Sequence, residues 1–256
     1  MKFRLAAMPC ICTAAAVALA AAACTPRCSS ERVEWVSMGT VAAFQCRNAA
    51  DLQKAQTVRE VFAKVEALLN AHDPDSELRR LAGLGDAEIL AACDPLVRPC
   101  YEAAFRYRDL SLGVFNPRYR GPGTMDLGGI AKGFAIDLAA DAIGPCDALI
   151  DLGGNLKALG GSWRVGVHGA NGPAPVTLNA GEACSTSGEY FRGKHIKDGR
   201  DGSDLSSKQY SVTAVHPESA MAADALSTIF FILGKEHAEA FAAGLPEHGA
   251  VKILWL

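Results

Sequence analysis

Apolar residues recur at helical spacing in several parts of the chain. Between Val58 and Leu69 they lie three or four positions apart, which places them on one face of a helix. The last such stretch is apolar almost throughout, so it is expected to be buried on all sides. The spacing predicts helices over about 51–70, 96–110, 126–143, where a glycine turn comes first, and 221–233.

Short apolar runs between glycines and turn residues predict strands. The first run is interrupted by Met38-Gly39-Thr40, which predicts a turn within it. Helices and strands are mixed without strict alternation, so we expect an α+β fold, a single domain of two intimate lobes. The predicted strands cover 35–46, 148–152, 163–167, 181–190, 211–215 and 250–256.

The N-terminus combines a short basic segment with a long run of small apolar residues. Lys2 and Arg4 precede an almost unbroken run over 5–23, which is rich in alanine and therefore only weakly hydrophobic. This composition favours a cleaved export signal over a membrane span. We therefore expect a signal peptide over 1–23, a tether over 24–34 and a folded domain over 35–256.

The residues before Cys24 are small, as they are in a lipoprotein signal. A lipid on Cys24 would hold the protein at the periplasmic face of the inner membrane without spanning it. Ala21 stands where a larger aliphatic residue is preferred. The alternative is cleavage by the ordinary signal peptidase at an Ala-x-Ala site, which leaves Cys24 as a plain thiol.

Nine cysteines are many for a reducing compartment. Cys10 and Cys12 lie in the predicted signal and Cys24 is the predicted lipid site, so six others remain. Up to three disulfides are therefore possible, and Cys93 and Cys100 are the pair that we expect to lie closest. There is no C-x-x-C, which argues against structural zinc. The net charge of −3, without a basic stripe, argues against a nucleic-acid partner.

The clearest chemical pattern lies on the last long predicted helix. Asp224 and Thr228 are four residues apart and share one helix face, which Ser227 borders. Their neighbours are apolar, and a carboxylate buried there needs a cation or hydrogen-bond donors. Mg²⁺ suits such a strip because it takes oxygen ligands. The alternative is that Asp224 bonds a neighbouring loop and Thr228 bonds back into its own helix.

Two further segments contain candidate ligand-binding residues. The glycines of 128–133 allow close approach at a helix entrance whose amides favour phosphate, and Lys132 adds a charge there. The hydroxyls of 185–187 can seat polar groups, and His195 is a candidate general base. The alternatives are a tight strand-to-helix turn for the first segment and a solvated polar loop for the second.

Taken together, the motifs closely resemble the ApbE family, the FAD:protein FMN transferases. The resemblance runs from about Trp35 to the C-terminus, including the Ser-Met-Gly-Thr of 37–40 and the Asp-Pro-Asp-Ser-Glu-Leu of 73–78. The remaining matches are Asp-Leu-Gly-Gly-Ile-Ala-Lys-Gly-Phe-Ala at 126–135, Asp-Leu-Gly-Gly-Asn at 151–155, Ser-Thr-Ser-Gly-Glu-Tyr at 185–190, His-Ile-x-Asp-x-Arg-x-Gly at 195–202, Ser-Val-Thr-x-Val-x-Pro at 211–217 and Ser-Ala-Met-x-Ala-Asp-Ala-Leu-Ser-Thr at 219–228.

The resemblance implies a Mg²⁺-dependent transfer of the FMN moiety of FAD to a Ser or Thr of a target protein, with release of AMP. It implies that Ala131, through its carbonyl, and the side chains of Asp224 and Thr228 hold the metal, with Ser227 beside them. His195 is the candidate that activates the acceptor hydroxyl. The flavin contacts that it implies are Met38, His72, Asp126, Phe134 and Lys197.

Three departures from the family pattern concern the flavin site. His72 stands where an aromatic residue is usual, and Gly199 replaces a proline. Only 117–124 separates two motifs between which the family has a much longer segment. FAD hydrolysis to FMN and AMP, or flavin binding without turnover, is therefore an alternative outcome. Subunits of exported redox complexes are the acceptors that the family suggests.

Overall fold

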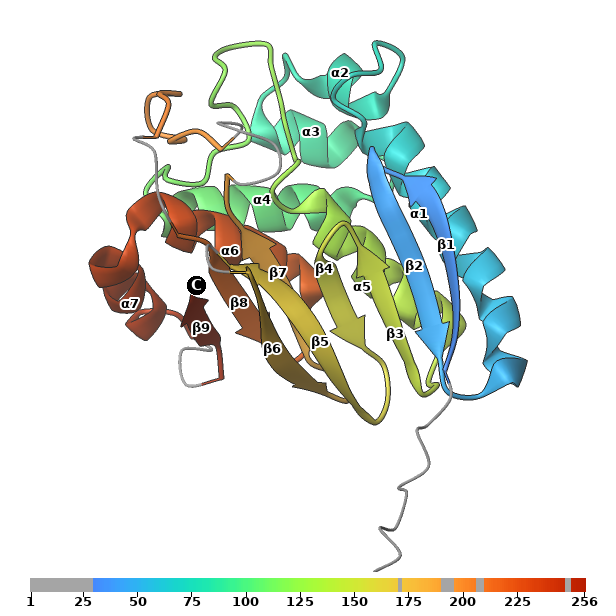
Figure 1. Ribbon diagram of the computed structural model, residues 1–256. Helices are drawn as coiled ribbons and strands as arrows, with labels where there is room; N and C mark the ends of the chain where they lie inside the picture. Colours follow the sequence, from blue (N-terminus) through green and yellow to red (C-terminus); the bar gives the residue numbers. More distant parts are fainter. Residues whose placement is uncertain (1–29, 170–171, 190–195, 206–209, 247–249) are drawn as a thin grey trace, which may run out of the picture.

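One antiparallel sheet of seven strands forms the centre of the fold, in the order β1-β2-β3-β4-β7-β8-β9 (Figure 1). The computed structural model describes residues 30–169, 172–189, 196–205, 210–246 and 250–256. The strands are β1 (Glu31–Ser37), β2 (Thr40–Cys46), β3 (Ala148–Leu152), β4 (Asn155–Ala158), β7 (Ala183–Ser187), β8 (Val212–His216) and β9 (Lys252–Trp255).

The first two strands form the predicted hairpin, in which Ser37 pairs with Thr40 across a two-residue turn. Met38 has φ +48 and Gly39 has φ +68, so both central residues of the turn are left-handed, as a tight hairpin requires. Strand β1 begins at Glu31, four residues before the predicted start of the domain.

Three helices pack side by side on one face of the sheet. Helix α1 (Lys54–Leu69) lies beside α5 (Ala131–Ile143), and α5 lies beside α6 (Ala220–Leu233) (Figure 1). A short 3₁₀ turn, η1 (Ala49–Gln53), precedes α1. Between these helices and the sheet lies the main hydrophobic core, which contains residues such as Phe44, Phe62, Ile136, Ile150 and Phe230.

The opposite face of the sheet is covered by a second hairpin, β5 (Ser162–Gly169) and β6 (Gly172–Asn179). Alternate residues of β5 are buried, so one side of this hairpin faces the sheet and the other faces water. Its inner side and the sheet form a smaller core that includes Trp163, Leu178 and Cys184. The predicted α+β class and single domain are confirmed.

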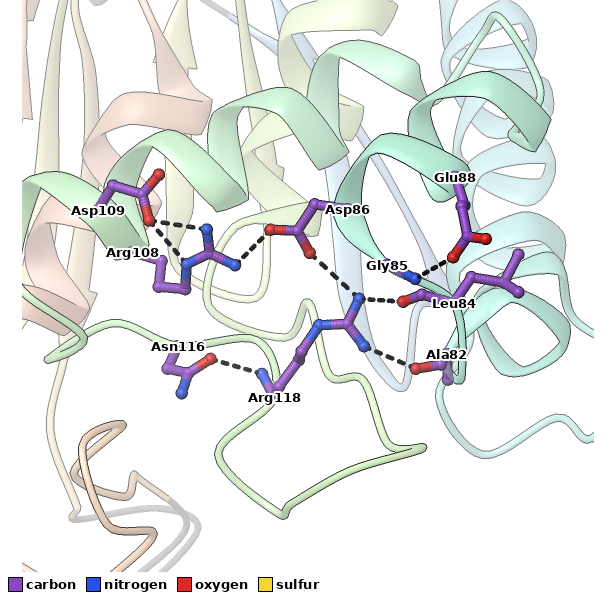
Figure 2. Close-up of polar contacts among 9 residues, drawn as sticks. All are labelled: Ala82, Leu84, Gly85, Asp86, Glu88, Arg108, Asp109, Asn116 and Arg118. Atoms are coloured by element: carbon purple, nitrogen blue, oxygen red, sulfur yellow. Dashed lines mark hydrogen bonds and ion pairs between the residues drawn. The ribbon is translucent and has the colours of Figure 1, made fainter.

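Helices α2 (Glu77–Leu81), α3 (Asp86–Ala92) and α4 (Arg98–Leu110) stand above one end of the helical layer (Figure 1). A polar network joins them to the short segment after α4 (Figure 2). Arg118 donates to the carbonyls of Ala82 and Leu84 at 2.7 Å each, and it pairs with Asp86 at 3.2 Å. Asp86 also accepts a bond of 2.6 Å from Arg108.

Five elements were not predicted from the pattern: α2, α3, β4, β6 and α7 (Lys235–Ala243). Helices of five and seven residues are too short to show a helical period. In α2 the helix depends on a local signal instead, since Ser76 caps it by accepting from the Arg79 amide at 3.2 Å. Within the part of the chain that is described, no helix has the length and hydropathy needed to span a membrane.

The disulfides that the cysteine count permits are not formed among the described cysteines. Cys46, Cys93, Cys100, Cys146 and Cys184 are all free, so Cys93 and Cys100, the pair expected to lie closest, are not bonded to each other. Four of the five are buried, and burial raises the pKa of Cys184 to about 12. These thiols pack as small apolar side chains in the two cores. Cys10, Cys12, Cys24 and Cys28 lie outside the described residues.

Candidate functional site

Asp224 is a buried carboxylate at the contact between α5 and α6, with 4 % of its surface exposed. Helix α6 begins at a good N-cap, because Ser219 accepts from the Ala222 amide at 3.0 Å. The helix is apolar on nearly every side, which brings Asp224 into the interior. A charge at this position must be compensated by the groups around it.

Two hydrogen-bond donors and one cation surround the Asp224 carboxylate. The Gly133 amide donates to Oδ2 at 3.0 Å and Ser185 Oγ donates to Oδ1 at 3.3 Å. The ammonium of Lys132 lies 3.6 Å from Oδ2 and donates to the Gly128 carbonyl at 2.8 Å. The nearest cation is therefore an ion-pair partner beyond hydrogen-bond distance of the carboxylate.

Four hydroxyl groups gather next to this carboxylate, two from β7 and two from α6. Ser187 Oγ lies 2.9 Å from Ser227 Oγ and 3.5 Å from Thr228 Oγ1. Ser227 Oγ also lies 3.1 Å from Ser185 Oγ. The structure thus joins the Asp224 motif to the Ser-Thr-Ser motif, about 40 residues apart in the chain.

The alternative expectation, that the Thr228 hydroxyl bonds back into its own helix, is also met in the structure. Ser227 and Thr228 donate back to the Asp224 carbonyl at 3.0 and 3.3 Å. Such bonds are weak and common in helices, and each hydroxyl keeps its oxygen lone pairs. The two side chains therefore remain able to act as oxygen ligands.

The glycine motif forms the entrance to α5, directly beside these hydroxyls. Ala131 is the first residue of the helix and is buried. A Cβ on Gly129 would lie 3.2 Å from Thr228 Oγ1, so only glycine lets the backbone come this close without displacing it. Ala131, Asp224, Ser227 and Thr228, the four predicted metal residues, therefore belong to one contact region between α5 and α6.

Asp126 lies just before this entrance and makes three polar contacts within the chain. Its carboxylate accepts from the Gly128 amide at 2.8 Å and from Tyr119 Oη at 3.1 Å, and Arg120 pairs with it at 3.2 Å. Burial, and then the charge of Asp126, raises the pKa of Tyr119. Sequence reasoning did not find Tyr119 and Arg120, because they lie in a segment that reads only as a Gly/Pro-rich loop.

Met38 and Phe134 have different surroundings. Glu66 of α1 accepts from the Met38 amide at 2.8 Å and from Ser37 Oγ at 3.2 Å, and so fixes the left-handed turn. Glu66 carries no sequence signal, since it reads as one of many polar residues on a helix surface. Phe134 has 5 % exposure and belongs to the main hydrophobic core.

The other predicted contacts lie in loops. His72 is exposed in the turn after α1, where its amide donates to Asn70 Oδ1 at 2.9 Å. Lys197 forms an ion pair with Asp204. His195 and Cys24 lie outside the described residues, so their predicted roles stay predictions.

The motif at 151–155 forms the turn between β3 and β4, and β4 pairs with β7 in the sheet. Gly153, Gly154, Thr186 and Gly188 line a hollow of about 110 Å³ between the sheet and β5. Asp151 accepts from the Gly154 amide at 3.0 Å and shapes this turn. The glycine turns therefore leave a small hollow on the β5 side of the sheet, whereas the hydroxyls of Ser185 and Ser187 point to the other side, toward α6.

The short segment after α4 is packed tightly against the loop that carries Gly199. The Gly199 amide donates to the Val114 carbonyl at 3.0 Å, and its carbonyl accepts from Asn116 Nδ2 at 2.9 Å. A Cβ on Gly199 would lie 2.6 Å from Val114 O. The segment after α4 thus explains the glycine at position 199, because its backbone occupies the space that a side chain on residue 199 would need.

Gly199→Pro, which would restore the residue usual in the family, is expected to destabilise this chain by about 1–3 kcal/mol. Proline removes the amide that bonds Val114 and adds ring atoms where only glycine fits. Thermal unfolding measures the change. Gly83→Ala, at a glycine with no atom near its Cβ position, is the control and should melt like the parent. An unchanged melting temperature for Gly199→Pro would contradict this packing argument.

Among the described residues there is no group of three or more His, Cys, Asp or Glu side chains that could hold a metal ion. The oxygen-rich contact region around Asp224 offers one carboxylate, several hydroxyls and backbone carbonyls instead.

Comparison with known proteins identifies the family. The model of the ApbE family matches residues 118–253, more than half of the chain and all of the described contact region around Asp224. The chain belongs to the ApbE family. This confirms the resemblance inferred from the motifs.

Relatives within the ApbE family are named FAD:protein FMN transferase. One, from Klebsiella pneumoniae (strain 342), is 35 % identical over 127 residues, which cover 44 % of this chain and 40 % of that protein. Another, from Rhodobacter capsulatus, is 33 % identical over 184 residues, covering 62 % of this chain and 34 % of the relative. The chain thus spans well under half the length of these curated relatives.

Solved structures of ApbE proteins share the fold. The flavin transferase ApbE from Vibrio cholerae superposes with a TM-score of 0.71 at 19 % identity, covering 89 % of this chain and 94 % of that one. The apo flavinyl transferase ApbE from Pseudomonas stutzeri gives a TM-score of 0.71 at 21 % identity, covering 89 % and 90 %. At these identities the likeness shows the fold alone.

Proposed function

We propose that this protein is a Mg²⁺-dependent FAD:protein FMN transferase, which transfers the FMN moiety of FAD to a Ser or Thr hydroxyl of a target protein and releases AMP. The observation that carries the proposal is the buried Asp224 carboxylate, beside which hydroxyls from β7 and α6 and the entrance of α5 come together. Membership of the ApbE family and the names of the relatives support it.

The residues present fit Mg²⁺. Magnesium takes oxygen ligands, binds through one or two carboxylates and completes its shell with phosphate oxygens and water. Asp224, Thr228 and the Ala131 carbonyl would hold the ion, with Ser227 beside them. Mg²⁺ held by these residues would supply positive charge for polarising the diphosphate and for stabilising the leaving AMP. Among the described residues, Lys132 is the only cation within ion-pair distance of the Asp224 carboxylate, at 3.6 Å.

Other residues of the chain bind and orient the substrate. The α5 entrance supplies amides suited to phosphate, and Lys132 adds a positive charge. Met38, His72, Asp126, Phe134 and Lys197 are proposed to contact the flavin half. The acceptor oxygen forms a bond to the phosphorus of the FMN half, and the bond to the AMP oxygen breaks. His195 is proposed to take the proton of the acceptor hydroxyl.

Hydrolysis of FAD to FMN and AMP is the second candidate. It requires the same metal site, with water in place of the acceptor hydroxyl. The observation that favours it is the short segment around Tyr119 and Arg120, which already occupies the Asp126 carboxylate. A reduced flavin seat would leave the diphosphate chemistry intact and weaken positioning of the ring against an acceptor.

We also propose that the protein is exported and anchored by a lipid on Cys24 at the periplasmic face of the inner membrane. The described fold begins at one end of β1, and the Met38 turn lies at the other end of that strand (Figure 1). An anchor near the start of β1 would direct the candidate site away from the membrane. Subunits of exported redox complexes are the acceptors we propose.

A direct transfer assay tests the function. The purified chain is mixed with FAD, Mg²⁺ and a domain that carries a flavinylation motif, and covalent flavin is read as in-gel fluorescence. EDTA should abolish the fluorescent band and excess Mg²⁺ should restore it, while an acceptor whose Ser or Thr is replaced by Ala should stay dark. AMP and free FMN without a band would identify the hydrolase. If neither covalent flavin nor AMP with free FMN is formed, both candidate functions are contradicted.

A further inference from the structure

The carboxylate of Asp137, on α5, caps the first turn of the neighbouring helix α6. Ser219 Oγ donates to it at 2.8 Å, and the amides of Ala220 and Met221 donate at 2.9 Å each. Lys157 of β4 adds a fourth bond of 2.7 Å. One side chain thus ties together two helices and a strand.

These bonds are made to groups that α6 cannot satisfy by itself. The first amides of a helix have no partner within the helix, and a negative charge there is favourable to the helix dipole. Ser219 bonds the Ala222 amide, which leaves the amides of Ala220 and Met221 to Asp137. Loss of the carboxylate would therefore remove the hydrogen bonds that tie the start of α6 to α5.

The segment from Gly129 along α5 contacts α6 at three successive places. As the residue number rises along α5, the residue number of the partner on α6 falls. Gly129 lies against Thr228, the Gly133 amide bonds Asp224, and Asp137 bonds the start of α6. Gly133 and Asp137 are four residues apart and so share one face of α5. Asp137 is the contact farthest along the chain from the Gly129 entrance, and it has no contact with the proposed metal ligands themselves among the described bonds.

We propose that Asp137 is a positioning residue for the metal site: it fixes the rotation and height of α6, which carries Asp224 and Thr228, relative to the Ala131 entrance of α5. The inference rests on the proposed function, since it concerns the same Mg²⁺ site. Residues that orient ligands from outside the coordination shell change metal affinity by about 10- to 100-fold when they are replaced.

Direct metal binding tests the inference. Mn²⁺ is titrated into the parent chain, Asp137→Asn and Asp141→Asn with FAD in excess and no acceptor, and bound Mn²⁺ is measured by electron paramagnetic resonance. Asparagine keeps the shape of Asp137 but turns amide hydrogens toward groups that already donate. Asp141, one turn further along α5, is exposed and is the control with the same change of charge.

We expect Asp137→Asn to weaken Mn²⁺ binding at least about tenfold and Asp141→Asn to leave it unchanged. Equal Mn²⁺ affinity of the parent and Asp137→Asn would overturn the positioning role while leaving the proposed function intact. Absence of Mn²⁺ binding by the parent itself would instead refute the metal-dependent function. If Asp137→Asn does not fold, Ser219→Ala, which removes one of the four donors, takes its place with a several-fold loss expected.

Discussion

Asp224→Ala is expected to lower the rate of FMN transfer by more than about 100-fold, beyond the loss that follows when a residue outside a metal's coordination shell is replaced. The side chain is the one carboxylate among the four proposed metal residues, so its removal takes away the charge that would bind the cation. The rate is measured from flavin fluorescence of the acceptor band over time.

Two further variants separate the chemistry from the fold. Asp224→Asn keeps an oxygen for the Gly133 amide, so it should melt near the parent and still lose transfer. Asp141→Ala removes an exposed charge from α5 and should retain full activity. Transfer at the parent's rate by both Asp224 variants would exclude this carboxylate as a metal ligand.

Local signals predicted much of the helical layer and of the site. The apolar run over 221–233 predicted α6, and the four-residue spacing placed Asp224 and Thr228 together. The turn at Met38 predicted the first hairpin. Each of these features depends on neighbours within a few positions, which is the range over which a sequence pattern determines geometry.

The contacts that complete the site come from distant parts of the chain. Ser185 and Ser187 meet Asp224 and Ser227 only because β7 lies under α6 in the sheet. The sequence around Ser185 predicts a strand, with a solvated polar loop as the alternative, and neither interpretation names its neighbours. Strand order depends on packing of the whole core, so these neighbours did not follow from the motifs alone.

The disulfides that the cysteine count permits are absent among the described cysteines for a physical reason of the same kind. An even number of cysteines in an exported chain permits pairing, but a bond also requires two Cβ atoms about 4 Å apart with suitable directions. The described thiols are packed instead among core residues, as Cys46 and Cys100 are in the main core. The cysteine count indicated an oxidising compartment, but packing in the core determines that the described thiols are free.

The Gly133 position decides how closely α5 and α6 approach. A Cβ there would lie 2.6 Å from the carbonyl carbon of Ala220 and 2.7 Å from Met221 Cα. Both are backbone atoms, so no side chain can rotate away to make room. Gly→Ala within a helix normally stabilises by about 1 kcal/mol, because alanine loses less backbone entropy on folding. Steric overlap with a packed helix costs about 1–3 kcal/mol or more, so we expect overlap to dominate.

Gly133→Ala should therefore lower the melting temperature by several degrees, since about 1 kcal/mol shifts a chain of this size by roughly 2–4 °C. Gly83→Ala, where a Cβ meets no atom within 4 Å, is the matched control and should not melt earlier than the parent. The helices of Gly133→Ala must separate, which lengthens the bond from the Gly133 amide to Asp224. Transfer should fall even at temperatures where the variant is fully folded. Unchanged stability and transfer would mean that the two helices can move apart freely, and that their close contact does not set the geometry of the site.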